Sequence, residues 1–230
     1  MSFSYETKNE LCRLPVQKLC CARAEAYGIL LYCNTFSATE VRVITENPNF
    51  AERLPKLFRR AFGLSFDRQP DKEQIEGKRI FQITDPRKLN HIINVLGYDP
   101  QQNLVLHINF AFMEEACDQA AFLRGAFFAG GSITDPQKRY HLELTTSHLQ
   151  VSREIESLLV ECGYPPKSLS RNGSSITYFK QSDQIEDFLT MIGAPVAAMN
   201  IMSAKLEKDL RNSVNRRLNC DSANLDKAVE

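Results

Sequence analysis

Cysteines are the side chains here that could bind a metal or take part in redox chemistry, but their spacing matches no common metal or redox motif. The chain of 230 residues contains seven of them, and no C-x-x-C pair occurs. Cys20 and Cys21 are adjacent, and two adjacent thiols rarely serve as ligands of one ion in tetrahedral geometry. We interpret the cysteines as structural or incidental thiols and expect no metal and no cofactor, with zinc as the alternative.

Charge and hydropathy limit the classes of function. Basic and acidic side chains number 28 each, so the formal net charge is zero, whereas a DNA-binding domain is usually basic. Apolar runs such as Ile29–Leu31 are far shorter than the ~20 residues of a membrane span. The first ten residues are polar and contain no signal core. We therefore expect a cytoplasmic protein without membrane contact.

Helix signals repeat along the chain at an interval of about 100 residues, and such an interval indicates an internal duplication. Asn47-Pro48 is typical of a helix start, and Ser147–Gln150 has the pattern of a capping box. The predicted helices are 48–62 and 86–96, followed by 148–162 and 183–192. A glycine suited to a left-handed C-cap follows each of the four.

Strand signals fall between these helices. The alternating segments are 40–45 and 78–84, followed by 140–145 and 174–180. Arg171-Asn-Gly-Ser174 is a hairpin turn signal before the last segment. Each half is predicted to run helix, two strands, helix, two strands, helix. We expect a duplicated α+β protein with halves at 1–113 and 114–200, and the alternative is two similar but unrelated modules.

The first helix of each half, predicted at 20–33 and 117–130, carries small residues four positions apart. Ala24 and Gly28 form one pair, and Gly125 and Ala129 form the other. This spacing places both members of a pair on one helix face, where small residues let two backbones approach closely. Glycine inside a helix costs about 1 kcal/mol relative to alanine, so close packing is the expected compensation. We predict that these helices pack at a pseudo-twofold axis; the alternative is that they are ordinary buried helices.

The second of these helices resembles the motif helix of LAGLIDADG homing endonucleases. The resemblance lies in Leu-Arg-Gly-Ala-Phe-Phe-Ala-Gly-Gly-Ser at 123–132, followed by Ile-Thr-Asp-Pro at 133–136, with a degenerate copy at 26–35. The order of elements is also that of this fold. More specifically, residues 1–3, 8–11, 20–25, 124–136 and 215–224 are similar to the bacterial WhiA regulators of sporulation and cell division.

This resemblance implies a scaffold without nuclease activity. In the nuclease family each motif helix ends in an acid, and two such acids hold the divalent metals that hydrolyse the phosphodiester. The corresponding positions here are Cys33 and Gly130, which are poor ligands for Mg²⁺. Asp135 lies five residues beyond and is expected in the following turn with Pro136.

The resemblance also implies that two small sheets form a saddle that straddles duplex DNA. On the strands we expect Val41, Val43, Tyr140, Leu142 and Leu144 to point inward. The expected DNA contacts are Arg42, Lys78, Arg79, Lys138, Arg139, His141, Arg171 and Lys180. Glu40 and Glu143 on the same faces would repel phosphate, so we predict weak binding to double-stranded DNA. The alternative is that these residues are ordinary solvated charges.

The C-terminal segment, 201–230, is expected to be a helical linker, with a helix from Ser203 to Leu218. In the WhiA family its last block resembles a connector into a helix-turn-helix domain, which this sequence lacks. Asn215, Arg216, Arg217 and Asn219 are candidate DNA contacts near this linker. The alternative is an amphipathic helix that caps the domain.

These expectations define one principal hypothesis and one alternative. The principal hypothesis is a nucleoid-associated transcription regulator of sporulation or cell division that binds DNA through an inactive homing-endonuclease scaffold. The alternative is a scaffold that binds a protein co-regulator, with DNA contact supplied by the absent helix-turn-helix domain. Because the pseudo-twofold axis is internal, a monomer is sufficient for either function.

Overall fold

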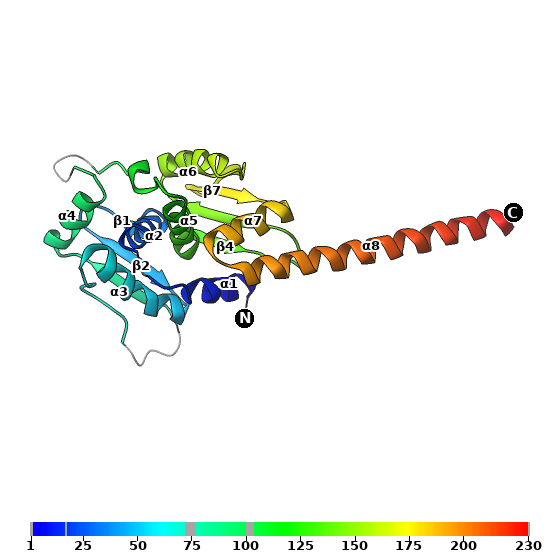
Figure 1. The fold of residues 1–230 in the computed structure, drawn as a ribbon, viewed down its shortest axis with the longest axis horizontal. Coiled ribbons are helices and arrows are strands. Elements are labelled where there is room, and N and C mark those ends of the chain that lie inside the picture. The colour runs from blue at the N-terminus through cyan, green and yellow to red at the C-terminus, as the bar shows by residue number, and fades with distance from the viewer. Residues whose placement is uncertain (1, 17, 72–76, 100–103, 230) are drawn as a thin grey trace.

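In the computed structural model, helices and two antiparallel sheets alternate along the chain (Figure 1). The structure describes residues 2–16, 18–71, 77–99 and 104–229, with side chains to residue 220. The first half contains α1 (Phe3–Cys12), α2 (Leu19–Tyr32), β1 (Thr35–Phe36), β2 (Val41–Thr45), α3 (Pro48–Phe62), β3 (Arg79–Ile83), α4 (Pro86–Val95) and the short 3₁₀ helix η1 (Phe110–Phe112). In the described residues, no helix is both long enough and apolar enough to span a bilayer.

The second half repeats this order with one more strand. It contains α5 (Ala116–Gly130), β4 (Gly131–Ile133), β5 (Leu142–Thr146), α6 (Leu149–Glu161), β6 (Lys167–Arg171), β7 (Ser174–Phe179) and α7 (Ser182–Ile192), and the long α8 (Pro195–Val229) follows. The α+β class and the two antiparallel sheets are as expected. One sheet has the order β1-β2-β3 and the other has the order β4-β5-β7-β6.

The first sheet departs from the expected pattern of four strands. Among the described residues between α3 and β3 (63–71, 77 and 78), a single bridge between Arg68 and Gln82 stands where the fourth strand was expected. The Asp67 carboxylate accepts hydrogen bonds from the backbone N–H groups of Thr84 (2.7 Å) and Asp85 (2.8 Å). A side chain thus takes over bonding that a strand would supply with its backbone, and the ladder does not extend.

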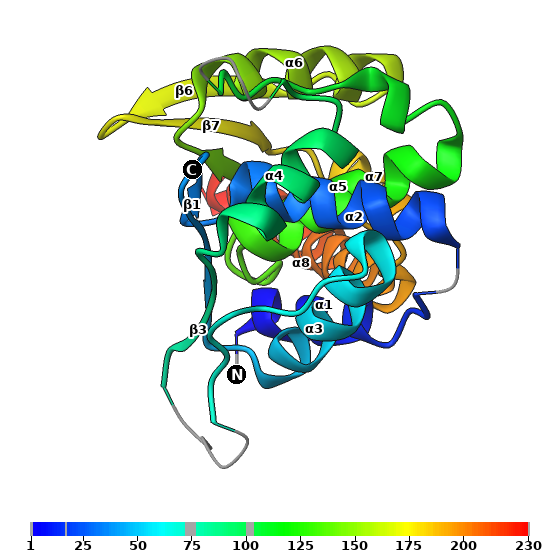
Figure 2. The same cartoon turned by 90° about the vertical axis from the view of Figure 1, so that its left-hand side faces the viewer.

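Helices α2 and α5 lie side by side behind the two sheets, whose strands share one side of the molecule (Figure 2). Their backbones touch where the glycines are. A Cβ atom on Gly28 would lie 2.1 Å from the carbonyl oxygen of Phe122, and one on Gly125 would lie 2.0 Å from that of Glu25. Ala24 is fully buried and Ala129 is half-buried against the core. The close approach that the small residues predict is therefore present.

A buried ion network joins the two halves beside this helix pair. Glu25 of α2 pairs with Arg53 of α3 through Nε–Oε1 (2.6 Å) and Nη2–Oε2 (2.9 Å). Arg124 of α5 reaches the same carboxylate with an Nε–Oε2 distance of 2.8 Å. The side chains of Glu25 and Arg53 are 2% and 4% exposed. One carboxylate thus compensates two arginines, one from each half, and nothing in the sequence spacing indicates this.

Two expectations about helix starts are wrong. The pattern at Ser147–Gln150 is not a capping box, because α6 has His148 as its N-cap without a side-chain cap. Instead, Thr146 Oγ1 accepts the hydrogen bond from His148 N. The last helix begins at Pro195 rather than Ser203, and the carboxylate of Glu10 in α1 caps it by accepting from Val196 N (2.7 Å) and Ala197 N (2.9 Å).

Candidate nucleic-acid interface

The outer face of the second sheet carries a cluster of polar and aromatic side chains. Glu143 of β5 lies opposite Tyr178 of β7 in the ladder. The ring centroid of His141 is 5.5 Å from that of Tyr178, and Lys180 Nζ is 5.1 Å from the Tyr178 centroid. His141 Nε2 is 3.1 Å from Glu143 Oε2, so Glu143 competes with any phosphate for this imidazole. Ser132 Oγ also donates to Glu143.

The outer face of the first sheet has Arg42 at its centre. Val41 and Val43 are buried as expected, and Arg42 is exposed between them. Its guanidinium donates to Thr35 Oγ1 (3.4 Å) and lies 3.8 Å from Glu40. The same Glu40 oxygen accepts a shorter hydrogen bond from Gln82 Nε2 (2.7 Å). Arg42 is therefore only loosely held and remains available to an anion.

Arg79 does not belong to this face. It is 7% exposed and donates to the backbone carbonyl of Glu46 (3.1 Å). The reason is strand alternation, because Phe81 and Ile83 of the same strand are buried and Arg79 shares their side. We withdraw it as a DNA contact, and its neighbour Lys78 is exposed.

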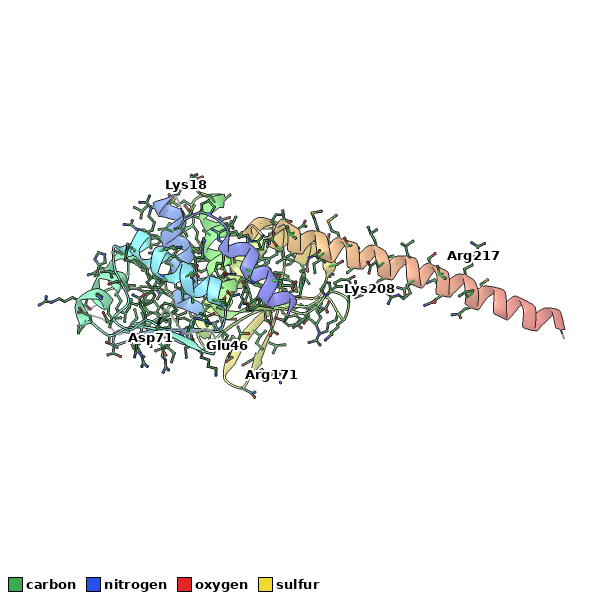
Figure 3. The ribbon with its side chains drawn as sticks, turned by 90° about the horizontal axis from the view of Figure 1, so that it is seen from below. Lys18, Glu46, Asp71, Arg171, Lys208 and Arg217 are labelled. Carbon is green, nitrogen blue, oxygen red and sulfur yellow. The ribbon has the colours of Figure 1, made fainter. Side chains whose placement is uncertain are left out.

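The remaining candidates on the strands and their loops lie at the surface, and His141 is half-buried. Exposed side chains from both halves are Lys78, Lys138, Arg139, Arg171 and Lys180. Glu46 and Arg171 lie along one edge of the molecule in Figure 3, opposite Lys18. Two further exposed cations, Arg68 and Lys167, belong to the same sheet edges and were missed. Lys167 faces Tyr178 in the ladder; the hairpin turn signal at Arg171–Ser174 indicated a strand before it, but the bounds of β6 were not predicted.

The outer faces are not uniformly polar. Ile44 and Ile80 are half-buried neighbours across β2 and β3. Ile176 and Leu169 are paired in the same way across β7 and β6, and the side chain of Leu169 is 42% exposed. The strand faces thus combine basic side chains with an apolar stripe.

Cys33 is the C-cap residue of α2, the position at which the resemblance predicts an acid in a nuclease. Cys33 donates to the carbonyl oxygens of Leu30 (3.2 Å) and Thr35 (3.1 Å). Burial raises the pKa of Cys33 to about 12, against the smaller lowering effect of its backbone hydrogen bonds. This group therefore stays a neutral thiol, which is not a ligand for a hard divalent cation.

At the end of α5, the corresponding position has no room for a side chain. A Cβ atom on Gly130 would lie 2.4 Å from the carbonyl oxygen of Thr145 and 2.7 Å from the ring of Tyr32. Asp135 is exposed in the next turn, as expected, and accepts from Gln137 N (2.9 Å). In the described chain, the one group of three or more potential metal ligands lies elsewhere, at the N-terminal ends of these helices.

Helix α8 leaves the body of the molecule and projects outward (Figure 1). Two of its residues contact the body where it leaves: Glu207 accepts from Gln137, and Lys208 donates to Pro136 O and lies 4.3 Å from the Tyr140 ring centroid. The tail candidates Asn215, Arg216, Arg217 and Asn219 are all exposed beyond these contacts. They lie on an outward extension of the fold, away from the strand faces.

Comparison with known proteins identifies close relatives over the whole chain. Residues 119–211 match the family model of the WhiA LAGLIDADG-like domain. The chain is 36% identical over 236 residues to a probable cell division protein WhiA of Ruminiclostridium cellulolyticum, with 100% of this chain and 75% of the relative covered. The corresponding protein of Alkaliphilus metalliredigens is 32% identical, with 100% and 76% covered.

Solved structures support the same fold. Full-length DUF199/WhiA from Thermatoga maritima superimposes with a TM-score of 0.72 at 20% identity, covering 97% of this chain and 73% of that one. The homing endonuclease I-DmoI, solved in complex with DNA and Mn, gives a TM-score of 0.53 at 12% identity, covering 76% and 98%. With its two sheets, its paired motif helices and these relatives, the chain belongs to the WhiA family of cell division proteins and has a LAGLIDADG-like fold.

Proposed function

We propose that this chain is a DNA-binding regulator that holds duplex DNA on its strand faces and does not cut it. The observation that carries the proposal is the pair of adjacent strand faces with exposed arginines in both halves, Arg42 and Arg171. Arginine at such positions contacts phosphates and fixes the protein on the duplex without reading sequence. The fold of I-DmoI, which was solved with DNA, supports this use of the strands.

The absence of cleavage follows from the two helix ends. Metal-dependent hydrolysis needs anionic oxygen ligands at the scissile phosphate, and Cys33 and Gly130 supply none. A plasmid-nicking assay with Mg²⁺ or Mn²⁺ tests this part. We expect supercoiled DNA to stay intact. Metal-dependent nicking by the purified chain that Asp135→Asn abolishes would contradict it.

The strand faces are tested with a matched pair of double variants. Arg42→Ala/Arg171→Ala removes one exposed arginine from each sheet, and Arg59→Ala/Arg153→Ala removes one from each covering helix, α3 and α6. In fluorescence anisotropy with a labelled duplex, we expect the first to weaken binding about tenfold at low salt and the second to leave it within about twofold. An equal loss of duplex affinity in the two double variants would mean that DNA does not bind on the strand faces.

A second candidate function, a platform for a protein co-regulator, is favoured by the apolar stripe of Ile44, Ile80 and Ile176 and by the acids Glu40 and Glu143 beside it. A gel shift comparing this chain with a version that carries a helix-turn-helix domain separates the two. Similar affinity supports DNA binding by this chain, and complete loss of binding without the added domain supports the platform.

A further inference from the structure

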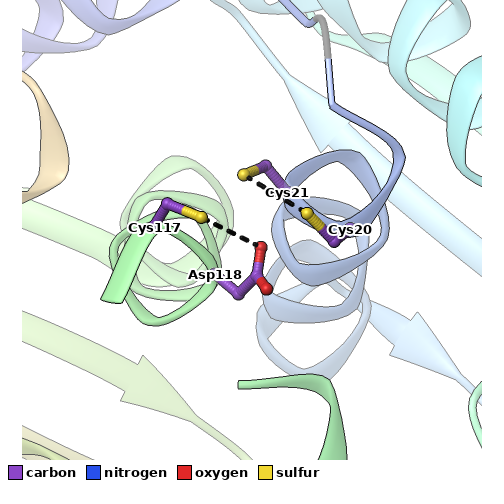
Figure 4. Close-up of side chains that lie close together, drawn as sticks. All are labelled: Cys20, Cys21, Cys117 and Asp118. Atoms are coloured by element: carbon purple, nitrogen blue, oxygen red, sulfur yellow. Dashed lines mark hydrogen bonds between the residues drawn. The ribbon is translucent and has the colours of Figure 1, made fainter. Parts of the chain in front are cut away.

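Three thiols and a carboxylate meet at the N-terminal ends of the two motif helices (Figure 4). Cys20 and Cys21 lie in the first turn of α2, and Cys117 and Asp118 lie in the first turn of α5. Their ligand atoms all lie within 4.8 Å of one another. The sequence separates the two pairs by about 100 residues, so only the pairing of the helices brings them together.

Within each pair, the distance between the two ligand atoms matches that expected for a tetrahedral zinc ion, and the two pairs lie within 4.8 Å of each other. Cys20 Sγ and Cys21 Sγ are 3.9 Å apart, and Cys117 Sγ and Asp118 Oδ1 are 3.6 Å apart. With Zn–S of about 2.3 Å and Zn–O of about 2.0 Å, a tetrahedron places two sulfurs about 3.8 Å apart and a sulfur and an oxygen about 3.5 Å apart. The adjacent cysteines can therefore share one ion, contrary to the expectation from their spacing.

The surroundings of the four groups call for a cation. Asp118 is 6% exposed and has no ion-pair partner in the described part of the chain. A buried carboxylate and clustered thiols repel one another once ionised, and a divalent ion relieves that repulsion.

The helix ends add a favourable field. Neither α2 nor α5 has a side-chain hydrogen bond at its N-cap, Lys18 or Glu115. Each N-terminus carries a partial positive charge that stabilises thiolates and carboxylates in the first turn. Both helices therefore direct this field at the same four ligands.

We propose that Cys20, Cys21, Cys117 and Asp118 bind one Zn²⁺, which fastens the N-terminal ends of the two motif helices together. Three thiolates and one carboxylate fill a tetrahedral shell, so the site is closed and structural rather than catalytic. Each thiol releases its proton to solvent on binding, and affinity falls steeply as pH is lowered. Soft thiolates select zinc over Mg²⁺ or Ca²⁺.

Cobalt(II) is a direct probe, because its spectrum reports both ligand type and geometry. We expect the reduced 230-residue chain to bind one Co²⁺ with the intense visible bands of a tetrahedral ion and thiolate charge-transfer absorption, and Zn²⁺ to displace it. Cys117→Ser and Cys20→Ser should lose these bands. The matched control Cys220→Ser, which changes an exposed thiol on α8, should keep them.

A readout on the unaltered chain guards against variants that misfold. Zn²⁺ should protect Cys20, Cys21 and Cys117 from alkylation, as seen by mass spectrometry, while Cys220 stays reactive. It should also raise the Tm of the wild-type chain but not of Cys117→Ser.

Three outcomes would each overturn the proposal: an octahedral cobalt spectrum, equal alkylation with and without Zn²⁺, or a Cys21–Cys117 disulfide in place of metal binding. Cys20 and Cys21 follow Lys18 in the first turn of α2, and Figure 3 shows Lys18 on the opposite side of the molecule from Arg171, so the metal assays probe a different surface from the DNA-binding assays.

Discussion

At the scale of single residues, the contact between the halves depends on two glycines and one carboxylate. Gly28 and Gly125 could be identified from spacing, because each shares one helix face with a small residue four positions away. Glu25 was not identifiable, since its partners Arg53 and Arg124 are far away in sequence. Local pattern thus indicated the close approach, whereas the charge network that accompanies it required the tertiary fold.

Gly125→Ala should destabilise the protein although alanine favours helices. In an open helix the change would gain about 1 kcal/mol. Here the added Cβ would lie 2.0 Å from the backbone oxygen of Glu25, so the helices must separate, and we expect a net loss of about 2–3 kcal/mol. Urea unfolding measures it. Ala120→Gly on the same helix is the control and should cost about 1 kcal/mol. A stabilised Gly125→Ala variant would refute the close contact.

Glu25→Gln should be among the most damaging conservative substitutions. It leaves the guanidinium groups of Arg53 and Arg124 without a counter-charge in a buried site, where removing one partner costs about 3–5 kcal/mol. The matched change Glu161→Gln on the exposed face of α6 should stay within about 0.5 kcal/mol. Chemical denaturation of both variants provides the comparison, and equal stability would mean that the buried network contributes nothing.

At the scale of elements, the predicted helices were more reliable than the strands. Left-handed glycines such as Gly63 and Gly193 end α3 and α7 as expected. The strand predicted between α3 and β3 was wrong because Asp67 bonds the backbone beyond β3. The start of α8 was missed because its cap, Glu10, comes from the other end of the chain. Features that depend on residues within one segment were predicted, whereas features that depend on contacts between segments were not.

Helix α8 should be stabilising only in its first turns. Ile201 is 1% exposed and Leu206 is 65% exposed, although both are large apolar residues on the same helix. We expect Ile201→Ala to lower the free energy of unfolding by about 2–4 kcal/mol and Leu206→Ala to change it by less than about 0.5 kcal/mol. Thermal unfolding of the pair decides this. A comparable loss at Leu206 would show that the outward part of α8 is covered in solution.

Removing the outward part of α8 distinguishes DNA binding by the strand faces from DNA binding by the C-terminal helix. Arg216 and Arg217 lie beyond Lys208, which contacts the body. Removal of residues 212–230 should leave the Tm unchanged within about 2 °C, because the side chains described from 212 to 220 are all exposed. If the strand faces carry most of the binding, anisotropy should show no more than about a threefold loss of duplex affinity. A larger loss would move the main DNA contact to the tail.

At the scale of the whole molecule, the duplication of the chain made the fold recognisable from sequence but did not indicate the contacts between the halves. The paired helices, the two sheets and the family were recognisable from sequence. The inward position of Arg79 and the cluster at Cys20 were not anticipated, because they depend on register and on contacts between halves. The result is an α+β scaffold in which the thiol of Cys33 follows the end of α2 and the crowded Gly130 ends α5.

The salt dependence of duplex affinity, measured in Mg²⁺ with the DNA recovered afterwards, tests the central claim most directly. A protein that neutralises Z phosphates shows a slope of about −0.9Z in log K against log salt. We expect a clear negative slope for the wild-type chain and a slope smaller in magnitude by about 2 for Arg42→Ala/Arg171→Ala, with all DNA intact. A slope near zero, or recovery of cleaved DNA, would contradict the account.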